Sequence, residues 1–391
     1  MVTRNVPQAD SIAYVRVEPT QRRPRPAREK STAFTKALAA FSALRTSLIA
    51  HPISFIATLC IAGGILLLLP DLLRFLIFDA VWRAPDGALC RAPGAGACWA
   101  FVADKLPYFI YGSYPPEQRW RVDIVLLIGA CLIFWQLAPS APSRRHAVRL
   151  FFLAYPVVAL ILLAGLPAFG LLRVPSDLWG GILVTLIVAL TGIVISLPLG
   201  VLLALARRSQ MPLLRITSII YIEVLRGVPM ITVLFMANTM LPLFLPESAV
   251  PNQLLRALVG VALFASAYMA EVVRGGLQVL PKGQGEAAQA LGLRYWAMQR
   301  LVILPQALRL VIPGIVNTFI GLFKDTTLVA TVGLFDFLRT VDSARLDPAW
   351  GGPTITPTAY VFAAIFYFMC CFAMARYSLL LERRLAVGQG I

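Results

Sequence analysis

Charged residues are scarce in this sequence: Asp, Glu, Lys and Arg together make up 14% of its 391 residues. Hydrophobic residues account for 59% of the chain, and the mean hydropathy is +0.77. A water-soluble globule of this composition would expose a very large apolar surface, so that class of protein is excluded. The composition instead predicts an integral membrane protein that crosses the lipid bilayer several times.

Acidic residues are the rarer of the two charged kinds, with 19 Asp and Glu against 35 Lys and Arg and a formal net charge of +16. In a soluble protein this excess would favour nucleic-acid binding. In a membrane protein it is ordinary, because basic residues collect in cytoplasmic loops and face anionic lipid. The basic run Arg22–Lys30 is proline-rich and has no interleaved aromatic residues. We therefore expect residues 1–45 to be a disordered cytoplasmic tail that binds no nucleic acid.

Catalytic and nucleotide-binding signatures are also missing. The two histidines, His51 and His146, are far apart and near the ends of apolar runs, so neither indicates a metal ligand or a general base. The sequence contains no Gly-x-Ser-x-Gly, no His-Glu-x-x-His and no phosphate loop of the form Gly-x4-Gly-Lys-Ser/Thr. We expect a protein that is not an enzyme and that has no metal and no cofactor.

Long apolar runs are abundant. The first begins near Thr46, after a polar segment and without a small-residue cleavage site, so we expect it to remain as a membrane anchor. Crossing the hydrocarbon takes about 20 helical residues. Eight runs predict an all-α fold with eight transmembrane helices, at residues 46–70, 124–139, 150–172, 178–206, 216–241, 254–276, 301–323 and 358–381.

The basic residues predict the orientation of these spans. They gather in the N-terminal tail and at residues 144–149, 207–215, 282–300 and 383–384, which alternating spans place on one side. We expect that side to be the cytoplasm of a bacterium, with the chain in the inner membrane and both termini cytoplasmic. The opposite, periplasmic side would receive the long loop of residues 71–121.

Two of the six cysteines, Cys90 and Cys98, lie in that loop and bracket a Gly/Pro-rich segment. Cysteines that close a short loop in an oxidising periplasm favour a disulfide, and two free thiols are the alternative. The spacing does not indicate a metal or redox site. The other four cysteines lie inside predicted spans, where we expect them to be packing residues.

Ionisable residues are concentrated in the second half of the chain. Glu223 with Arg226, and Glu271 with Arg274, are three residues apart, so each pair can meet on one helix face. Such pairs are either interfacial or line a polar pathway, because a charge inside the bilayer is costly. The polar run Lys324–Thr327 follows Asn317 in an apolar stretch, and broken helices of this kind form substrate sites in transporters.

A polar, helix-prone segment, Gly283–Pro305, also interrupts this half of the chain. Glu286 follows a glycine-rich break, where a helix start favours a carboxylate, and Gly292 suits a left-handed helix end. Ala287 and Ala288 leave the short helix almost bare, so another protein surface can approach its backbone. An ordinary helical loop would explain Glu-Ala-Ala alone, but the whole pattern indicates a docking element.

This pattern resembles the loop of ABC-importer permeases, written Glu-Ala-Ala, three residues, Gly, nine residues, Ile-x-Leu-Pro. The chain has Val302 in place of the Ile and matches the other positions at Glu286, Ala287, Ala288, Gly292, Leu304 and Pro305. Three further segments look like signatures of permeases for polar amino acids: Tyr221–Pro229, Glu271–Gly276 and Lys324–Leu328.

The resemblance covers about residues 178–384 and implies the five-helix core of a type I (MetI-like) ABC importer. Residues 46–177 would add three helices and a cysteine-containing periplasmic loop, residues 277–305 would form the coupling (EAA) loop, and residues 385–391 a C-terminal tail. The N-terminal extension is similar to that of the general L-amino-acid permeases, which import glutamate, glutamine, aspartate and asparagine, and to their M-type subunit.

The family's partners would be an ABC ATPase dimer, a second homologous permease that forms a heterodimer with this chain, and a periplasmic amino-acid-binding protein. The resemblance assigns ATPase coupling to Glu286, Ala287, Ala288, Gly292 and Pro305. We expect the pathway of the L-amino-acid substrate to be lined by Glu223, Arg226, Asn317, Lys324, Asp325 and Thr326.

Two rival functions remain from the residues alone. A secondary amino-acid transporter would explain the charges in the spans but gives the Gly283–Pro305 segment no purpose, and it favours two halves with related charge patterns. An intramembrane enzyme is the less favoured rival, because the histidines and the missing catalytic patterns give it no support.

Overall fold

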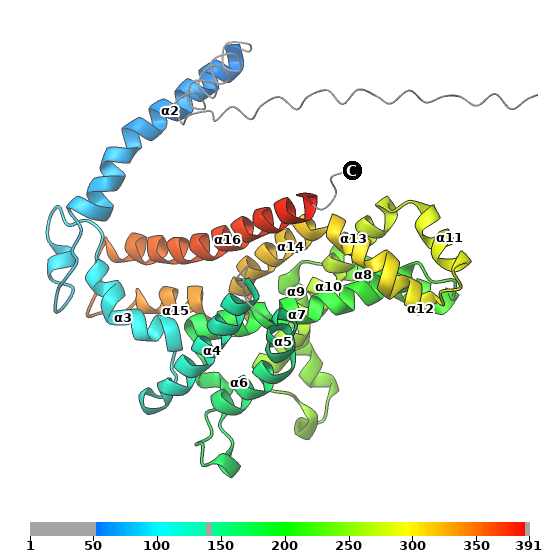
Figure 1. The fold of residues 1–391 in the computed structure, drawn as a ribbon. Helices are drawn as coiled ribbons and strands as arrows, with labels where there is room; N and C mark the ends of the chain where they lie inside the picture. Colours follow the sequence, from blue (N-terminus) through cyan, green and yellow to red (C-terminus); the bar gives the residue numbers. More distant parts are fainter. Residues whose placement is uncertain (1–51, 138–142, 388–391) are drawn as a thin grey trace, which may run out of the picture. The chain divides into compact units, whose positions relative to one another are not determined.

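The computed structural model describes residues 52–137 and 143–387. The predicted basic tail of residues 1–45, the first residues of the first predicted span, and residues 388–391 lie outside the described residues. Within the described ranges the chain is almost entirely helical, as the apolar runs predict (Figure 1).

The chain divides into two compact units, Met1–Asp71 and Leu72–Ile391. The described part of the first unit lies in helix α2, Pro52–Leu73, in which none of residues 53–73 is buried within the chain. A helix that is apolar on all sides is suited to contact with lipid.

The second unit contains the remaining described elements. Those before the predicted core are helices α3 (Trp99–Tyr111), α4 (Arg119–Leu137), α5 (Arg144–Arg149) and α6 (Tyr155–Ala164). Those of the core are α7 (Gly181–Arg207), α8 (Pro212–Gly227), α9 (Met230–Phe235), α10 (Gln253–Val279), α11 (Lys282–Ala290), α12 (Tyr295–Met298), α13 (Leu304–Leu310), α14 (Ile312–Asp325), the two-residue strand β1 (Phe335–Asp336), α15 (Phe337–Ala344) and α16 (Ile355–Val387).

The number of spans agrees with the sequence, but two of their courses do not. Seven helical stretches of the described residues are long and apolar enough to cross a membrane, and a bent helix pair raises the number to eight. The predicted span 216–241 is this pair, bent by 108° between Gly227 and Met230. Pro229 at the bend has no amide hydrogen and cannot continue the helix. The predicted span 301–323 is interrupted at Val311, and its apolar part continues to Val332.

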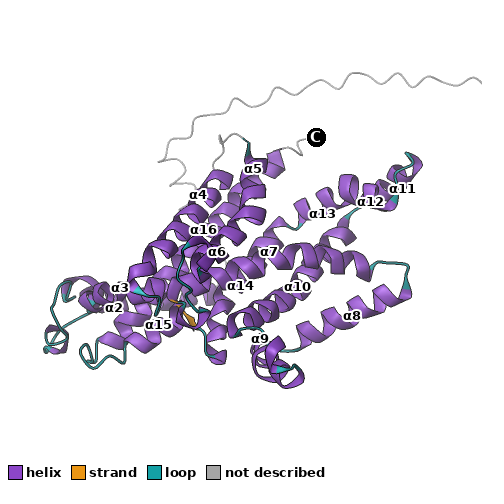
Figure 2. Cartoon of the chain, turned by 90° about the horizontal axis from the view of Figure 1, so that it is seen from below, coloured by secondary structure: helices purple, strands orange, loops and turns teal. Residues whose placement is uncertain are grey.

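Helix α7 packs extensively against α10, which runs beside it (Figure 2). Small residues allow this approach: a Cβ on Gly200 would come 2.7 Å from the Met269 side chain, and one on Gly192 would come 3.1 Å from Val261. Close backbone approach at glycines is how spanning helices gain packing contacts in a solvent that is itself apolar.

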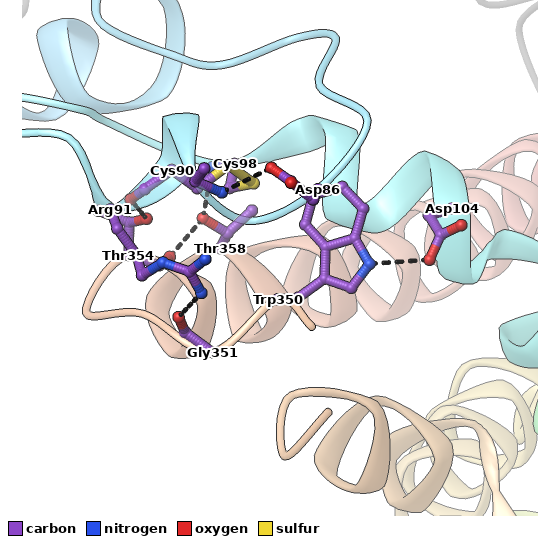
Figure 3. The surroundings of a disulfide bond; sticks show 10 residues. Asp86, Cys90, Arg91, Cys98, Asp104, Trp350, Gly351, Thr354 and Thr358 are labelled. Atoms are coloured by element: carbon purple, nitrogen blue, oxygen red, sulfur yellow. Dashed lines mark hydrogen bonds between the residues drawn. A yellow bond between two sulfur atoms is a disulfide. The ribbon is translucent and has the colours of Figure 1, made fainter. Parts of the chain in front are cut away.

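Residues 79–111, which we call the disulfide cap, pack on the segment between α15 and α16 (Figure 3). Cys90 and Cys98 form a disulfide, and both are fully buried. The Thr354 hydroxyl donates to the Cys90 carbonyl (3.1 Å), and the Cys98 amide donates to the Thr358 hydroxyl (3.0 Å). Arg91 donates to the Gly351 carbonyl at 2.9 Å. These hydrogen bonds hold both ends of the disulfide loop, at Cys90 and at Cys98, against the start of α16.

Charged groups on α3 complete this contact. Lys105 forms ion pairs with Asp347 (2.6 Å) and Asp104 (3.1 Å), and the Trp350 indole donates to Asp104 at 2.9 Å (Figure 3). The hydrogen bond from Lys105 lowers the pKa of the Asp347 carboxyl. The segment of residues 71–121, which the sequence analysis predicted as a long loop, contains the helix α3.

The start of α7 is enclosed between the cap and the strand β1. Gly180 and Gly181 pair with Phe335 and Asp336 in parallel bridges. Gly181 has φ +66°, and a Cβ there would lie 2.2 Å from the Phe109 carbonyl of α3. Only glycine permits this crossing of three backbone segments.

We expect the disulfide to be present in the purified protein. In a variant that keeps only Cys90 and Cys98, maleimide added in denaturant should label neither cysteine before reduction and both after it. Closing a loop of this length restricts the unfolded chain by about 2–3 kcal/mol, so replacing both cysteines by serine should lower the thermal midpoint. Labelling of both residues without reductant would contradict the structure. The four residues replaced in the background are Cys60, Cys131, Cys370 and Cys371.

Candidate functional site

The predicted docking helix is α11, Lys282–Ala290. It begins after Pro281, so Gly283 and Gly285 lie within the helix and form no break, which corrects the sequence-based expectation. Its end follows the prediction: Gly292 has φ +75°, and the Gly292 and Leu293 amides donate to carbonyls of the last helical turn. A left-handed glycine of this kind closes a helix end.

The two faces of α11 differ. Glu286 and Ala287 are exposed, whereas Ala288 is 3% exposed and packs inward. A Cβ on Gly283 or Gly285 would meet nothing within 4 Å. Of the residues expected to form the bare docking surface, Glu286 and Ala287 are therefore exposed, whereas Ala288 packs against its own chain.

The exposed surface extends beyond α11. Leu291 is 82% exposed and Trp296 66% exposed, on either side of Gly292. Pro305 lies exposed in the first turn of α13, and the neighbouring Gln306 amide donates to the Gln284 side chain at 3.1 Å. This bond connects α11 to α13, which leads directly into the spanning helix α14.

Three arginines surround Glu271 near the same end of the spans. Its carboxylate accepts from Arg274 (2.7 Å) and Arg207 (2.8 Å) and lies 3.5 Å from Arg226. Arg207 also donates to Glu223 at 2.9 Å. We call these five residues the Glu271 cluster; it joins α7, α8 and α10 through charges whose burial would be costly if they were unpaired.

The cluster changes the interpretation of two predicted pathway residues. The spacing of Glu223 and Arg226 suggested that they pair with each other, but they do not. Glu223 binds Arg207, and Arg226 binds Glu271. The local pair of Glu271 with Arg274 does form. Among the described residues no ion pair connects Glu223 or Arg226 to Lys324, so the structure does not bring the six predicted pathway residues together.

A second polar feature lies on α14. Asn317 and Lys324 are both exposed and are seven residues apart, so they share one helix face with Gly321, where a Cβ would meet open space. Lys324 lies about 18 Å along the helix from Ile312. In the part of the chain that the structure describes, Lys324 forms no ion pair. An unpaired cation on a spanning helix marks a polar pathway or a partner surface.

The two residues after Lys324 are less exposed than it is. Asp325 is half-buried and, like Lys324, has no ion pair within the described ranges. Thr326 is completely buried, and its hydroxyl donates to the Phe323 carbonyl at 2.8 Å. Thr326 therefore does not share the exposed face of Asn317 and Lys324, although it was predicted to line the same pathway.

Sequence reasoning missed two residues. Arg207 was used only to predict orientation, yet it bridges Glu223 and Glu271; its place at the end of an apolar run was the available signal. Asp336, outside these sites, is completely buried. Nothing in its local sequence separates it from the partly buried Asp342 and Asp347.

The described residues contain no group of three or more His, Cys, Asp or Glu side chains that could hold a metal. α11 and α12 lie at the opposite end of the second unit from α3 and α15 in both views (Figures 1 and 2). A multi-span helical chain with an exposed docking helix at one end and an unpaired cation on a span has the features of a membrane transport subunit.

Comparisons with known proteins lead to the same class. Residues 196–387 match the family described as binding-protein-dependent transport system inner membrane component. The inner membrane amino-acid ABC transporter permease protein YhdY of Escherichia coli K12 is 52% identical, over 82% of this chain and 86% of its own length. The glutamate/glutamine/aspartate/asparagine transport system permease protein BztC of Rhodobacter capsulatus is 41% identical, over 79% and 85%. The chain belongs to this family of inner-membrane transport components.

A solved structure, described as an amino acid ABC transporter with histidines, is also similar. It is 28% identical with a TM-score of 0.45, and the alignment covers 51% of this chain and 90% of that one.

Replacing Glu271 by Gln should destabilise the second unit, because Arg226 and Arg274 would lose their counter-charge and Arg207 would keep only Glu223. We expect a loss of about 2 kcal/mol, less than for a fully buried pair since each arginine is partly hydrated. Thermal unfolding in detergent micelles measures this. Glu223→Gln is the matched control: its side chain is 55% exposed and has one partner, so its cost should stay below about 1 kcal/mol. Equal losses would show that Glu271 is not the centre of the cluster.

Proposed function

We propose that this chain is a transmembrane permease subunit of an ATP-driven, binding-protein-dependent importer of L-amino acids. The observation that carries the proposal is the α11 surface, an exposed helix on which Ala287 and two glycines leave part of the backbone uncovered beside Glu286. Such a helix is suited to seat in a groove of another protein. The printed names of the two relatives supply the substrate class.

The energy source is a separate ABC ATPase dimer, since the sequence has no phosphate loop. ATP-driven closure of that dimer would pull α11, and the Gln284–Gln306 bond would pass the displacement to α13 and α14. Coupling then rests on Glu286, Ala287, Gly292 and Pro305, with Ala288 holding α11 in place.

The pathway would run along the exposed face of α14. A zwitterionic amino acid presents one carboxylate and one ammonium group, which Lys324 and Asp325 can bind, while Asn317 offers an uncharged polar contact on the same helix. We assign Glu223 and Arg226 to the Glu271 cluster, at the docking end of this pathway. A second homologous permease would cover the unpaired Lys324 face and complete the channel.

The remaining partner is an amino-acid-binding protein on the side of the disulfide cap. That side is the periplasm in this proposal, because a buried disulfide belongs to an oxidising compartment. The docking loop and both termini then lie in the cytoplasm, in agreement with the distribution of basic residues.

Reconstitution in proteoliposomes with the ATPase, the second permease and the binding protein tests the proposal. The assembly should take up radiolabelled glutamate, glutamine, aspartate or asparagine only with ATP, and these amino acids should stimulate ATP hydrolysis. Uptake by this chain alone, driven by an ion gradient without ATP, would instead establish a secondary transporter.

The docking assignment has its own test in the same assay. Glu286→Lys should lower stimulated ATP hydrolysis and uptake at least tenfold, because a cation replaces the carboxylate on the docking surface. Gln210→Lys is the matched control: it is exposed in the turn between α7 and α8, outside the docking loop, and should remain within twofold of the wild type. Normal coupling in Glu286→Lys would refute the role of α11.

A further inference from the structure

A cluster of buried polar side chains lies behind the turn that carries Lys324 and Asp325. It consists of four residues from four elements: Thr185 of α7, Thr326 of the turn after α14, Asp336 of β1 and Tyr367 of α16. The first three are completely buried, and the Tyr367 hydroxyl is shielded from solvent as well. Buried polar groups are costly unless they are hydrogen-bonded, so their gathering at one point requires an explanation.

Two members have clear partners. Asp336 caps α15, where its carboxylate accepts from the Leu338 and Arg339 amides at 3.1 Å each. The Thr185 hydroxyl accepts from the Phe337 amide at 2.9 Å. These bonds attach the start of α15 to α7, next to the bridge between Gly181 and Asp336.

Thr326 connects the cluster to the proposed pathway. It immediately follows Lys324 and Asp325, and its side chain is directed to the interior, whereas Lys324 is exposed. One short turn of the chain therefore joins the exposed face of α14 to the buried cluster.

Tyr367 is the member without a partner. Its ring packs against Phe323 and Phe337, with centroids 5.6 and 5.8 Å away. Its hydroxyl is directed toward Asp336, Thr326 and Thr185. Among the described residues, none of these gives it a hydrogen bond of normal geometry. A phenylalanine would fill the same space without this cost.

We propose that Tyr367 and Asp336 are positioning residues for transport: from behind Thr326 they hold the orientation of the turn that carries Lys324 and Asp325. This inference rests on the proposed function, and it identifies groups outside the pathway that orient the substrate-binding segment.

Asp336 is buried among few charged neighbours. Burial raises the pKa of its carboxyl to about 6. Among the described residues, the titratable or charged groups that face it are Tyr367 from α16 and Arg339 on α15, whose guanidinium pairs with Asp342. From α7 and the turn after α14 it meets only the uncharged Thr185 and Thr326.

Tyr367→Phe is the central test, because it removes the hydroxyl and keeps the ring. We expect an unchanged or higher thermal midpoint, since an unsatisfied group is deleted. In proteoliposomes the maximal rate of L-glutamine uptake should fall at least threefold, while the concentration at half-maximal uptake changes less than twofold. Tyr377→Phe, on the same helix and partly exposed, is the matched control and should match the wild type.

Outcomes of this test separate the two proposals. If the wild-type assembly shows no ATP-dependent uptake, the proposed function fails and the cluster is judged by hydrogen exchange of the full chain in detergent. There Tyr367→Phe should alter the exchange of amides 324–334 and leave those of α4 unchanged. Wild-type uptake together with unaltered exchange in Tyr367→Phe would overturn the positioning role.

Asp336→Asn supplies an independent arm, because Asn is an equally good helix cap and carries no charge. In the wild type the raised pKa means that the folded state holds the proton more tightly than the unfolded chain. Stability should therefore fall as the pH rises from about 4 to about 6 and then level off. The variant should lack this decline in thermal midpoint, and an identical pH profile would contradict the buried state of Asp336.

Discussion

A charge on a helix that crosses the hydrocarbon must be paired or must face water, and this constraint sorts the polar residues of the chain. The Glu271 cluster obeys it by pairing: three arginines share one carboxylate and hold α7, α8 and α10 together. Lys324 obeys it differently, because it is exposed and forms no ion pair among the described residues. The same physical rule thus separates residues that hold the spans together from the residue that we propose to face a substrate or a second subunit.

Helix α7 connects the two ends of the second unit. Its 27 residues span about 40 Å, from the glycines enclosed by α3 and β1 to Arg207 in the Glu271 cluster. Gly192 and Gly200 let α14 and α10 approach its backbone in between. The disulfide cap, α14 and the Glu271 cluster are consequently all in contact with this one helix.

Much of this could be predicted from the sequence because it depends on local properties. Hydropathy predicted eight spans, and Gly292 predicted a left-handed helix end; both agree with the structure. The bend at Pro229 and the early start of α11 were missed, although their signals were local. The partner of Glu223 and the inward rotation of Thr326 could not be predicted, since they depend on residues brought together by tertiary packing.

The disulfide cap also has a consequence for biosynthesis. Cys90 and Cys98 are eight residues apart and can join as soon as their loop has crossed the membrane. Their hydrogen-bond partners lie about 260 residues later in the chain. At ribosomal rates of about 5–20 residues per second the loop waits roughly 10–50 seconds for them. The disulfide cap therefore completes its contacts only after the segment at the start of α16 has also been exported.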